Sequence, residues 1–299
     1  MDRVARKPFV SDKLARKRKS QAKLRRFFSL CIVLAVLSGV GYVMYANRFQ
    51  LQGVDVTGSQ AVPAEEIVAY ANDLIAGKRF YIFPRRNIFL YSKSREAAEL
   101  ASAFPRLKTI TISVVSQRLA VVVTEREPAY MWCGETIPET RQASFESTCY
   151  FVDSTGYIFS LAPQFSDSVY QRIYTSLNHP DAPIGQFAMS ATTLTRVSSF
   201  AKEITSQTFE PSAYSITSDG DALIFLYRDS DTSPVIRYNP LHDPLTVVAQ
   251  FKAAIASEPL HTKLSFGVDA LEYIDVRFPN KIFYKFTDDA GQQQDTTKK

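Results

Sequence analysis

One stretch of the chain limits what the protein can be: nineteen consecutive residues, Phe27 to Tyr45, carry no charge. As a helix rising 1.5 Å per residue, this run is about 28 Å long, which matches the hydrocarbon core of a bilayer. A cleaved signal peptide is the rival interpretation, but its apolar core is usually shorter, and Val43-Met44-Tyr45-Ala46 is a poor small-x-small cleavage site. We therefore expect a transmembrane helix over residues 27–46.

Basic residues stand mainly on one side of this apolar run. Residues 1–26 contain eleven Lys or Arg against two Asp, a net charge of about +9, although the whole chain carries only +5. Because positive residues stay on the cytoplasmic side, we expect the N-terminus in the cytoplasm and the chain after residue 48 outside it. The tail is also dense enough to touch anionic lipid or nucleic acid, but a topology signal explains it, and no specific nucleic acid is expected.

Residues 48–127 have the pattern of a small domain with helices on one side of a short sheet. Apolar residues recur at helical spacing in two stretches, and strict alternation marks the strands. The polar Ser116-Gln117-Arg118 predicts the turn of a hairpin. The expected elements are a strand over 49–57 with a kink at Gly53, helices over 63–76 and 94–104, and strands over 109–114 and 119–124. The first helix is expected to bury Ile67, Tyr70, Ala71 and Leu74.

Residues 128–286 predict a second, mainly antiparallel domain, because short runs rich in aromatic and β-branched residues recur along it. Two helices interrupt the strands: one carries Leu194 to Ile204, and the other starts at the cap Asp243 followed by Pro244. Residues 287–299 have almost no apolar side chains and predict a disordered tail. The strand candidates are 129–132, 150–152, 157–161, 213–216, 222–227, 235–238 and 272–286.

The three cysteines do not form one group. Cys31 lies inside the apolar run and is most simply a small apolar residue. Cys133 and Cys149 are sixteen positions apart, and each adjoins a strand candidate. In an oxidising compartment this spacing suits a disulfide, whereas two unpaired thiols are natural if the organism does not oxidise exported proteins.

Chemistry-bearing motifs are scarce. The histidines His179, His242 and His261 stand alone, so neither a metal site nor a cofactor is expected. Cys149 after Ser147-Thr148 invites comparison with a membrane-anchored cysteine transpeptidase. In that family the cysteine ends a strand with the pattern T-L-x-T-C, and the histidine lies well upstream. Here every histidine lies downstream, so an enzyme is not expected. Among the carboxylates, which include Asp153, Asp219, Asp221 and Asp275, most lie in turn contexts such as Asp-Ser-Thr-Gly, so they need no glycosidase pair to explain them.

The order of parts resembles the FtsQ/DivIB family of bacterial cell-division proteins. Members have a basic cytoplasmic tail, one span, a POTRA domain and a β domain. The resemblance is carried by four stretches in the family's order: Phe49 to Thr57, Val123 to Trp132 with Glu125-Arg-Glu-Pro128, Tyr150 to Phe159 with Val152-Asp153-Ser-Thr-Gly156, and Leu271 to Phe278. It implies an α+β fold with a POTRA-like β-α-α-β-β domain over 48–127 and a β domain over 128–286. Members commonly have Gly in the turn after the last stretch, where this chain has Phe278-Pro279-Asn280-Lys281.

The resemblance also implies a function: a non-enzymatic scaffold at the division septum that binds FtsB/FtsL-like single-span proteins and other divisome components and helps regulate septal peptidoglycan synthesis. Binding in this family occurs largely by strand addition at the last strand of the β domain. Arg277 and Phe278 match the family's arginine and aromatic residue. The last strand corresponds to Lys281, Ile282, Phe283, Tyr284, Lys285 and Phe286.

Two alternatives remain at this point. Phe278 and Phe286 also read as ordinary core aromatics, because alternation places Phe278 on the same face as Ile274 and Val276. At the level of function, the alternatives are a POTRA-bearing protein of transport or assembly and an envelope transpeptidase or hydrolase.

Overall fold

The chain divides into two compact units, each described by itself below. One consists of Met1–Leu100 with Ile110–Val123, and the other of Ala101–Thr109 with Thr124–Lys299. In this computed structural model the expected boundary near residue 127 stays a prediction. The structure describes residues 12–79, 83–138, 147–165, 169–205, 209–226, 234–265, 271–278 and 280–287, without the side chains of 12–19, 79 and 265.

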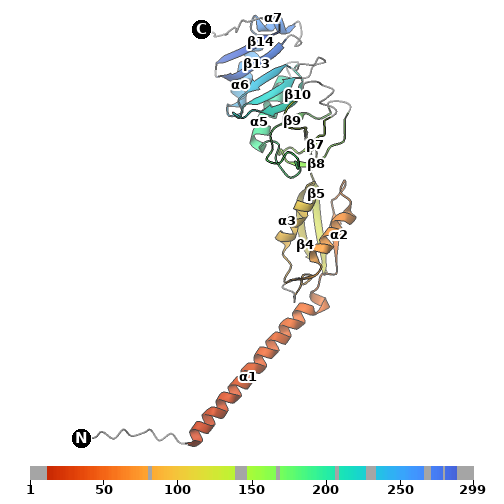
Figure 1. The fold of residues 1–299 in the computed structure, drawn as a ribbon, viewed down its shortest axis with the longest axis vertical. Helices are drawn as coiled ribbons and strands as arrows, with labels where there is room; N and C mark the ends of the chain where they lie inside the picture. Colours follow the sequence, from red (N-terminus) through yellow and green to blue (C-terminus); the bar gives the residue numbers. More distant parts are fainter. Residues whose placement is uncertain are drawn as a thin grey trace, which may run out of the picture. The chain divides into compact units, whose positions relative to one another are not determined.

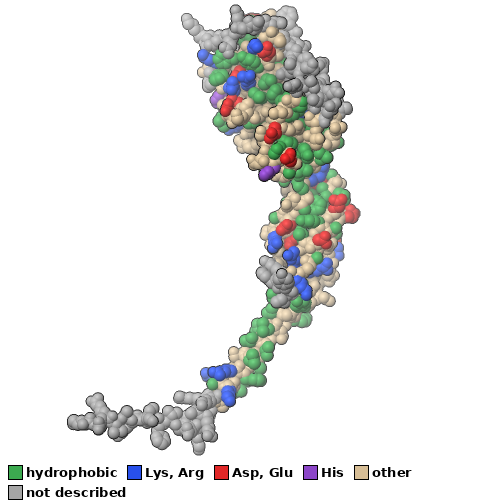
Figure 2. Space-filling view, viewed as in Figure 1, with side chains coloured by type: hydrophobic (Ala, Val, Ile, Leu, Met, Phe, Trp, Pro, Cys, Tyr) green, Lys and Arg blue, Asp and Glu red, His purple; other side chains and the backbone are tan. Residues whose placement is uncertain are grey.

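The apolar run lies in a single long helix, α1 (Asp12–Tyr45). Its segment Ser20–Tyr45 is long and apolar enough to cross a membrane, and none of its apolar window is buried. Figure 2 shows hydrophobic side chains along this helix and basic side chains near its N-terminal end. Within the described ranges, one helix, near the N-terminus, is thus long and apolar enough to span a bilayer, as the sequence predicted.

A three-stranded sheet in the order β1-β5-β4 forms the centre of the expected first domain. Its strands are β1 (Gly53–Thr57), β4 (Leu107–Val115) and β5 (Arg118–Glu125). β1 runs parallel to β5, with Gly53 opposite Arg118. The hairpin between β4 and β5 turns at Ser116 and Gln117, whose φ angles are both positive, at 48° and 63°. Two such residues give a turn whose twist matches the flanking strands.

The expected helices of this domain are α2 (Ala64–Ile75) and α3 (Lys93–Ala103), with a small ribbon of β2 (Lys78–Arg79) and β3 (Phe83–Pro84) between them. The buried face of α2 is shifted from the predicted one, because Ile67 and Ala71 are buried together with Ile75. The predicted strand over 49–57 is shorter than expected. Its first residue, Phe49, instead ends a 3-10 turn, η1 (Asn47–Phe49), and β1 begins at the expected kink, Gly53.

The second unit contains a nine-stranded sheet in the order β14-β13-β12-β11-β10-β9-β6-β7-β8 (Figure 1). β9 pairs in parallel with β6 and β10, β12 pairs in parallel with β13, and the other neighbours are antiparallel. The fold is therefore α+β with a mainly antiparallel sheet. The strands are β6 (Tyr130–Trp132), β7 (Tyr150–Val152), β8 (Ile158–Leu161), β9 (Arg172–Tyr174), β10 (Pro211–Ile216), β11 (Ala222–Leu226), β12 (Val235–Tyr238), β13 (Leu271–Phe278) and β14 (Lys281–Phe286).

The main core of this unit lies between the sheet and the helices α5 (Ala191–Thr205) and α6 (Pro244–Ile255). Phe200 of α5 stacks on Tyr238 of β12 with ring centroids 4.7 Å apart, and it forms a T-shaped pair with Phe251 of α6. The predicted cap is present, since Asp243 accepts a hydrogen bond of 2.9 Å from the backbone N–H of Thr246. A short helix, α7 (Leu260–Ser265), follows α6 and was not predicted. The expected tail over 287–299 lies outside the described residues apart from Thr287.

Candidate partner-binding edge at β14

β14 is the last strand at one end of the nine-stranded sheet, so only one of its two sides pairs with another strand of that sheet. That pairing is antiparallel to β13, with Ile274 opposite Tyr284 and Asp275 opposite Phe283. The outer side of a terminal strand is where a strand from another chain can be added. β14 covers the same residues as the last strand, at which we predicted partner binding from the sequence.

The side chains of β14 alternate strictly between the core and the outer face. Ile282, Tyr284 and Phe286 are only 3–6% exposed and belong to the main core. Lys281, Phe283 and Lys285 alternate with them and keep more of their surface accessible. Of the six predicted strand residues, three are therefore available mainly through their backbone, and three also through their side chains.

Phe278 does not lie on the core face, so the alternative interpretation of it as a core aromatic beside Ile274 and Val276 is wrong, whereas Phe286 is buried in the core. The pairing of β13 with β14 shifts register between Asp275 and Phe278, which ends the strict alternation. Phe278 is 45% exposed, and its ring meets the ring of Phe283 edge-on with centroids 5.5 Å apart. The end of the hairpin thus carries a pair of aromatic rings beside the sheet edge.

Arg277 is held in place by two carboxylates. Its Nε and Nη2 atoms donate to Asp275 at 2.9 and 2.6 Å, and Nη1 donates to Asp221 of the neighbouring turn at 2.7 Å. These hydrogen bonds, those to Asp275 above all, raise the pKa of Arg277 above its ordinary value. The guanidinium also lies 5.4 Å from the centroid of the Phe278 ring. The structure therefore assigns Arg277 the role of supporting this corner of the sheet, and Asp221 does more than the turn residue predicted from the sequence.

The two lysines of β14 differ in their surroundings. Lys285 pairs with Glu272 of β13 at 2.7 Å, and this hydrogen bond raises the pKa of the lysine. Lys281 is exposed at the start of the strand, next to Asn280 with its φ of 61°. The asparagine thus takes the positive φ for which glycine is usual in this turn. Among the described residues, no cluster of three His, Cys, Asp or Glu is placed to hold a metal ion.

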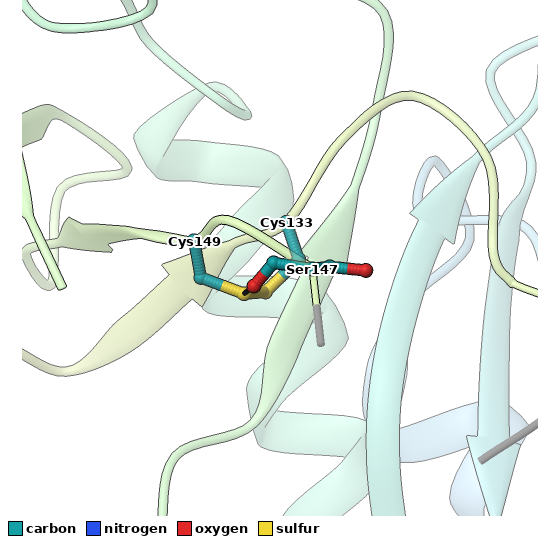
Figure 3. The surroundings of a disulfide bond; sticks show 3 residues. All are labelled: Cys133, Ser147 and Cys149. Atoms are coloured by element: carbon teal, nitrogen blue, oxygen red, sulfur yellow. Dashed lines mark hydrogen bonds between the residues drawn. A yellow bond between two sulfur atoms is a disulfide. The ribbon is translucent and has the colours of Figure 1, made fainter. Parts of the chain in front are cut away.

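Cys133 and Cys149 face each other across the pairing of β6 with β7. Trp132 is opposite Tyr150 in that antiparallel pair, so the residue after Trp132 and the residue before Tyr150 come next to each other. The structure joins their Sγ atoms at 2.05 Å, with the Cα atoms 4.2 Å apart and Ser147 alongside (Figure 3). Both cysteines are more than nine-tenths buried, in a small apolar cluster that includes Met131 and Tyr174.

The Val152-Asp153-Ser-Thr-Gly156 stretch forms the tight turn between β7 and β8 that the sequence predicted. Oδ1 of Asp153 accepts hydrogen bonds from the backbone N–H groups of Thr155 and Tyr157 at 2.8 and 3.2 Å. Gly156 has a φ of +88°, and a Cβ there would meet the carbonyl oxygen of Met189 at 2.2 Å. Glycine is thus required both by the backbone angle and by the close approach of a second segment.

Comparison with known proteins bears on this fold. No protein-family model matches the chain. The cell division protein FtsQ of Chloroflexus aurantiacus is 29% identical to it over 164 residues. The resemblance to the FtsQ family is confirmed. The match covers 53% of this chain and 51% of the Chloroflexus FtsQ, so the chain spans about half the length of the curated relative that it matches.

Proposed function

We propose that this protein acts in bacterial cell division as a membrane-anchored, non-enzymatic member of the FtsQ/DivIB family. The observation that carries the proposal is the combination of an N-terminal apolar helix, the position of β14 at one end of the sheet and similarity to an FtsQ protein. The basic residues before the anchor support a body outside the cytoplasm, and the first sheet with its two helices supports a POTRA-like domain. In this role the protein holds division proteins together at the septum and so influences septal peptidoglycan synthesis.

The proposed partners are single-span division proteins of the FtsB and FtsL kind, which add a strand alongside β14, the terminal strand of the sheet. Backbone hydrogen bonds supply much of the affinity in this mode, and side chains supply specificity. The residues that offer those side chains are Lys281, Phe283 and Lys285 on the strand and Phe278 beside it. The exposed Lys281 favours an acidic partner segment and discourages pairing between two copies of the same edge.

The burial of the cysteines favours a scaffold over a transpeptidase. A cysteine nucleophile must be available as a thiolate, whereas Cys149 is buried next to Cys133 at disulfide distance. The histidines stay far from it in sequence and give no reason to assign a base. The alternative of a protein in transport or assembly has no observation of its own in its favour, so we carry only the division proposal further.

Depletion of the protein in its host tests the cell-division role. We expect filamentous cells that fail to divide, and a fluorescent fusion to the N-terminus that collects at division sites. Normal division after depletion would contradict the role.

A proline in β14 tests how partners are captured. Phe283→Pro removes a backbone donor and stiffens the strand, while the core residues Ile282 and Tyr284 stay in place. We expect weaker co-isolation of single-span division proteins, whereas Leu161→Pro in β8, the strand at the opposite edge of the sheet, leaves it unchanged. If the Phe283→Pro protein has an unchanged melting profile and still captures its partners, strand addition at β14 is wrong.

A further inference from the structure

The end of the apolar helix is closed by a residue that lies far away in the sequence. Asn87, which is fully buried, donates hydrogen bonds from Nδ2 to the backbone carbonyls of Val43 at 2.9 Å and Met44 at 3.3 Å. The last carbonyls of a helix have no partner within the helix and need one from elsewhere. Asn87 supplies it for α1.

The segment around Asn87 is also bound to the residues that follow α1. The backbone N–H of Leu51 donates to the carbonyl of Arg86 at 2.8 Å, and the N–H of Ile88 donates to the carbonyl of Phe49 at 2.9 Å. Oδ1 of Asn87 accepts from the N–H of Phe89 at 2.9 Å. The position of Phe89 along the axis of α1 is therefore set by hydrogen bonds to the end of that helix.

The side chains presented by this junction are aromatic and basic. Phe89 is 65% exposed, and its ring centroid lies 5.5 Å from that of Phe49. The guanidinium of Arg48 lies 5.2 Å from the Phe49 centroid, and Arg85 and Arg86 are exposed next to Asn87. We refer to Arg48, Phe49, Arg85, Arg86 and Phe89 together as the collar. Figure 2 shows basic side chains on the first unit close to the end of α1.

We propose that the collar docks on the outer leaflet of the membrane, with Phe89 at the boundary of the acyl chains and the arginines on lipid phosphates. The proposal rests on the membrane span proposed above. Aromatic rings gather at the membrane interface, and arginine binds phosphate through its planar set of donors. An aromatic side chain this exposed, held at the end of a span, lies at the depth where that interface begins.

Lipid is a better occupant than a second transmembrane helix. Helices pack in membranes through small residues that let backbones approach closely, whereas the collar consists of three arginines and two phenylalanines. Its place next to the end of the span brings it to the headgroups without any further partner. Asn87 then links the body of the first unit to the bilayer as well as to the helix.

Tryptophan fluorescence in the full-length protein tests this docking. The chain has one native tryptophan, the buried Trp132, which gives a constant background. Phe89→Trp is compared with Val122→Trp, an exposed position in β5 of the same sheet, and with Leu34→Trp in the middle of the span. Each protein is reconstituted alone in nanodiscs of phosphatidylcholine and phosphatidylglycerol with acyl chains brominated near the glycerol end, and the Leu34→Trp protein also in nanodiscs with chains brominated near the methyl end.

We expect bromine to quench the tryptophan at position 89 at least about twofold more than that at position 122. Quenching at 89 no greater than at 122, while position 34 is quenched, would overturn the docking and leave the span intact. A lack of quenching at position 34 would overturn the span, and with it the proposed anchoring.

A double variant, Asn87→Asp with Phe89→Trp, tests whether Asn87 links the collar to the end of α1. Aspartate keeps the acceptor for the N–H of Phe89 but cannot donate to the carbonyls of Val43 and Met44. Quenching at position 89 should fall toward that at position 122. Asn72→Asp is the matched control, because Nδ2 of Asn72 also donates to a helix carbonyl, that of Val68 at 2.9 Å, away from the collar. Equal quenching in both variants would show that Asn87 does not hold the collar in place.

Discussion

Arg126 donates a hydrogen bond of 2.5 Å from Nη1 to Oδ2 of Asp153, and so fixes the segment after β5 to the turn between β7 and β8. The arginine side chain is 18% exposed and the aspartate side chain 5%. The same guanidinium lies 4.0 Å from the centroid of the Tyr157 ring, and its Nε donates to the carbonyl of Pro105 at 3.1 Å. Two of the short motifs in the sequence, Glu-Arg-Glu-Pro and Val-Asp-Ser-Thr-Gly, thus meet in one ion pair.

Asp153→Asn should destabilise the second unit by about 2 kcal/mol, because it leaves the charge of Arg126 partly buried without its partner. Chemical unfolding followed by circular dichroism measures the loss. Asp55→Asn is the control, since Asp55 pairs with Arg118 on the surface and its loss should leave the unfolding midpoint unchanged. An equal loss in both variants would contradict a special role for the buried pair.

The dependence of this effect on pH follows from the pKa of Asp153. Burial acts to raise that pKa, but hydrogen bonds from Thr155, Arg126 and Tyr157 outweigh it and hold the pKa below the ordinary value of 3.8. The stabilisation is therefore fully present above the unfolded-state pKa and is lost as pH falls through the lower folded-state pKa. The gap between wild type and Asp153→Asn should shrink in acid, and a gap that stays constant there would contradict the assignment.

Gly156→Ala should cost about 3 kcal/mol or more, because alanine adds a clash with the carbonyl oxygen of Met189 to the strain of a positive φ. Gly220→Ala separates the two effects. Gly220 has a φ of +84° with no heavy atom within 4 Å of the added Cβ, so only about 1 kcal/mol should be lost. Thermal melting of the two variants checks the difference, and equal melting points would show that the close approach at Gly156 is not important.

The Cys133–Cys149 pair should appear as a disulfide in the exported protein, and its removal should cost roughly 3 kcal/mol by the chain-entropy argument for a loop of this size. Mass spectrometry of non-reduced peptides tests the bond, and unfolding of a Cys133→Ala, Cys149→Ala double variant tests its contribution. Cys31→Ala, which lies outside the pair, should change neither the disulfide nor the free energy of unfolding. Two thiols that alkylate in the native protein would exclude the disulfide.

A reporter fused after Lys299 should be active outside the cytoplasm, because the basic residues precede the apolar helix. Alkaline phosphatase, which needs an oxidising compartment, reports that location, and the same fusion placed after Arg26 should be inactive. An active fusion after Arg26 together with an inactive fusion after Lys299 would contradict the proposed orientation.

Local patterns in the sequence were sufficient for many elements. The Asp243-Pro244 start of α6 and the polar turn at Ser116 and Gln117 depend on neighbouring residues alone, and both were predicted correctly. β9 was missed because a run of three residues that begins with an arginine lacks the apolar pattern of β6 and β7, which are equally short. It is a strand because β6 and β10, which are distant in the sequence, pair with it on both sides.

The details of the candidate site were less accessible from the sequence. Alternation placed Phe278 in the core, but a shift in the pairing of β13 with β14 turns it outward, and such a shift leaves no periodic signal. The ion pair between Arg277 and Asp221 joins residues 56 positions apart, and Asn87 reaches Val43 across 44 positions. These contacts depend on the tertiary arrangement, so residue types and spacing could not predict them.

Site-specific photo-crosslinking in dividing cells tests the central claim most directly. A photoreactive phenylalanine analogue at Phe283, on the outer face of β14, is compared with the same analogue at Leu161 in β8, which is 59% exposed at the opposite edge of the sheet. We predict that position 283 forms an adduct with a single-span division protein and that position 161 does not. An adduct from position 161 alone, or none from position 283 while the protein supports division, would contradict binding at the β14 edge.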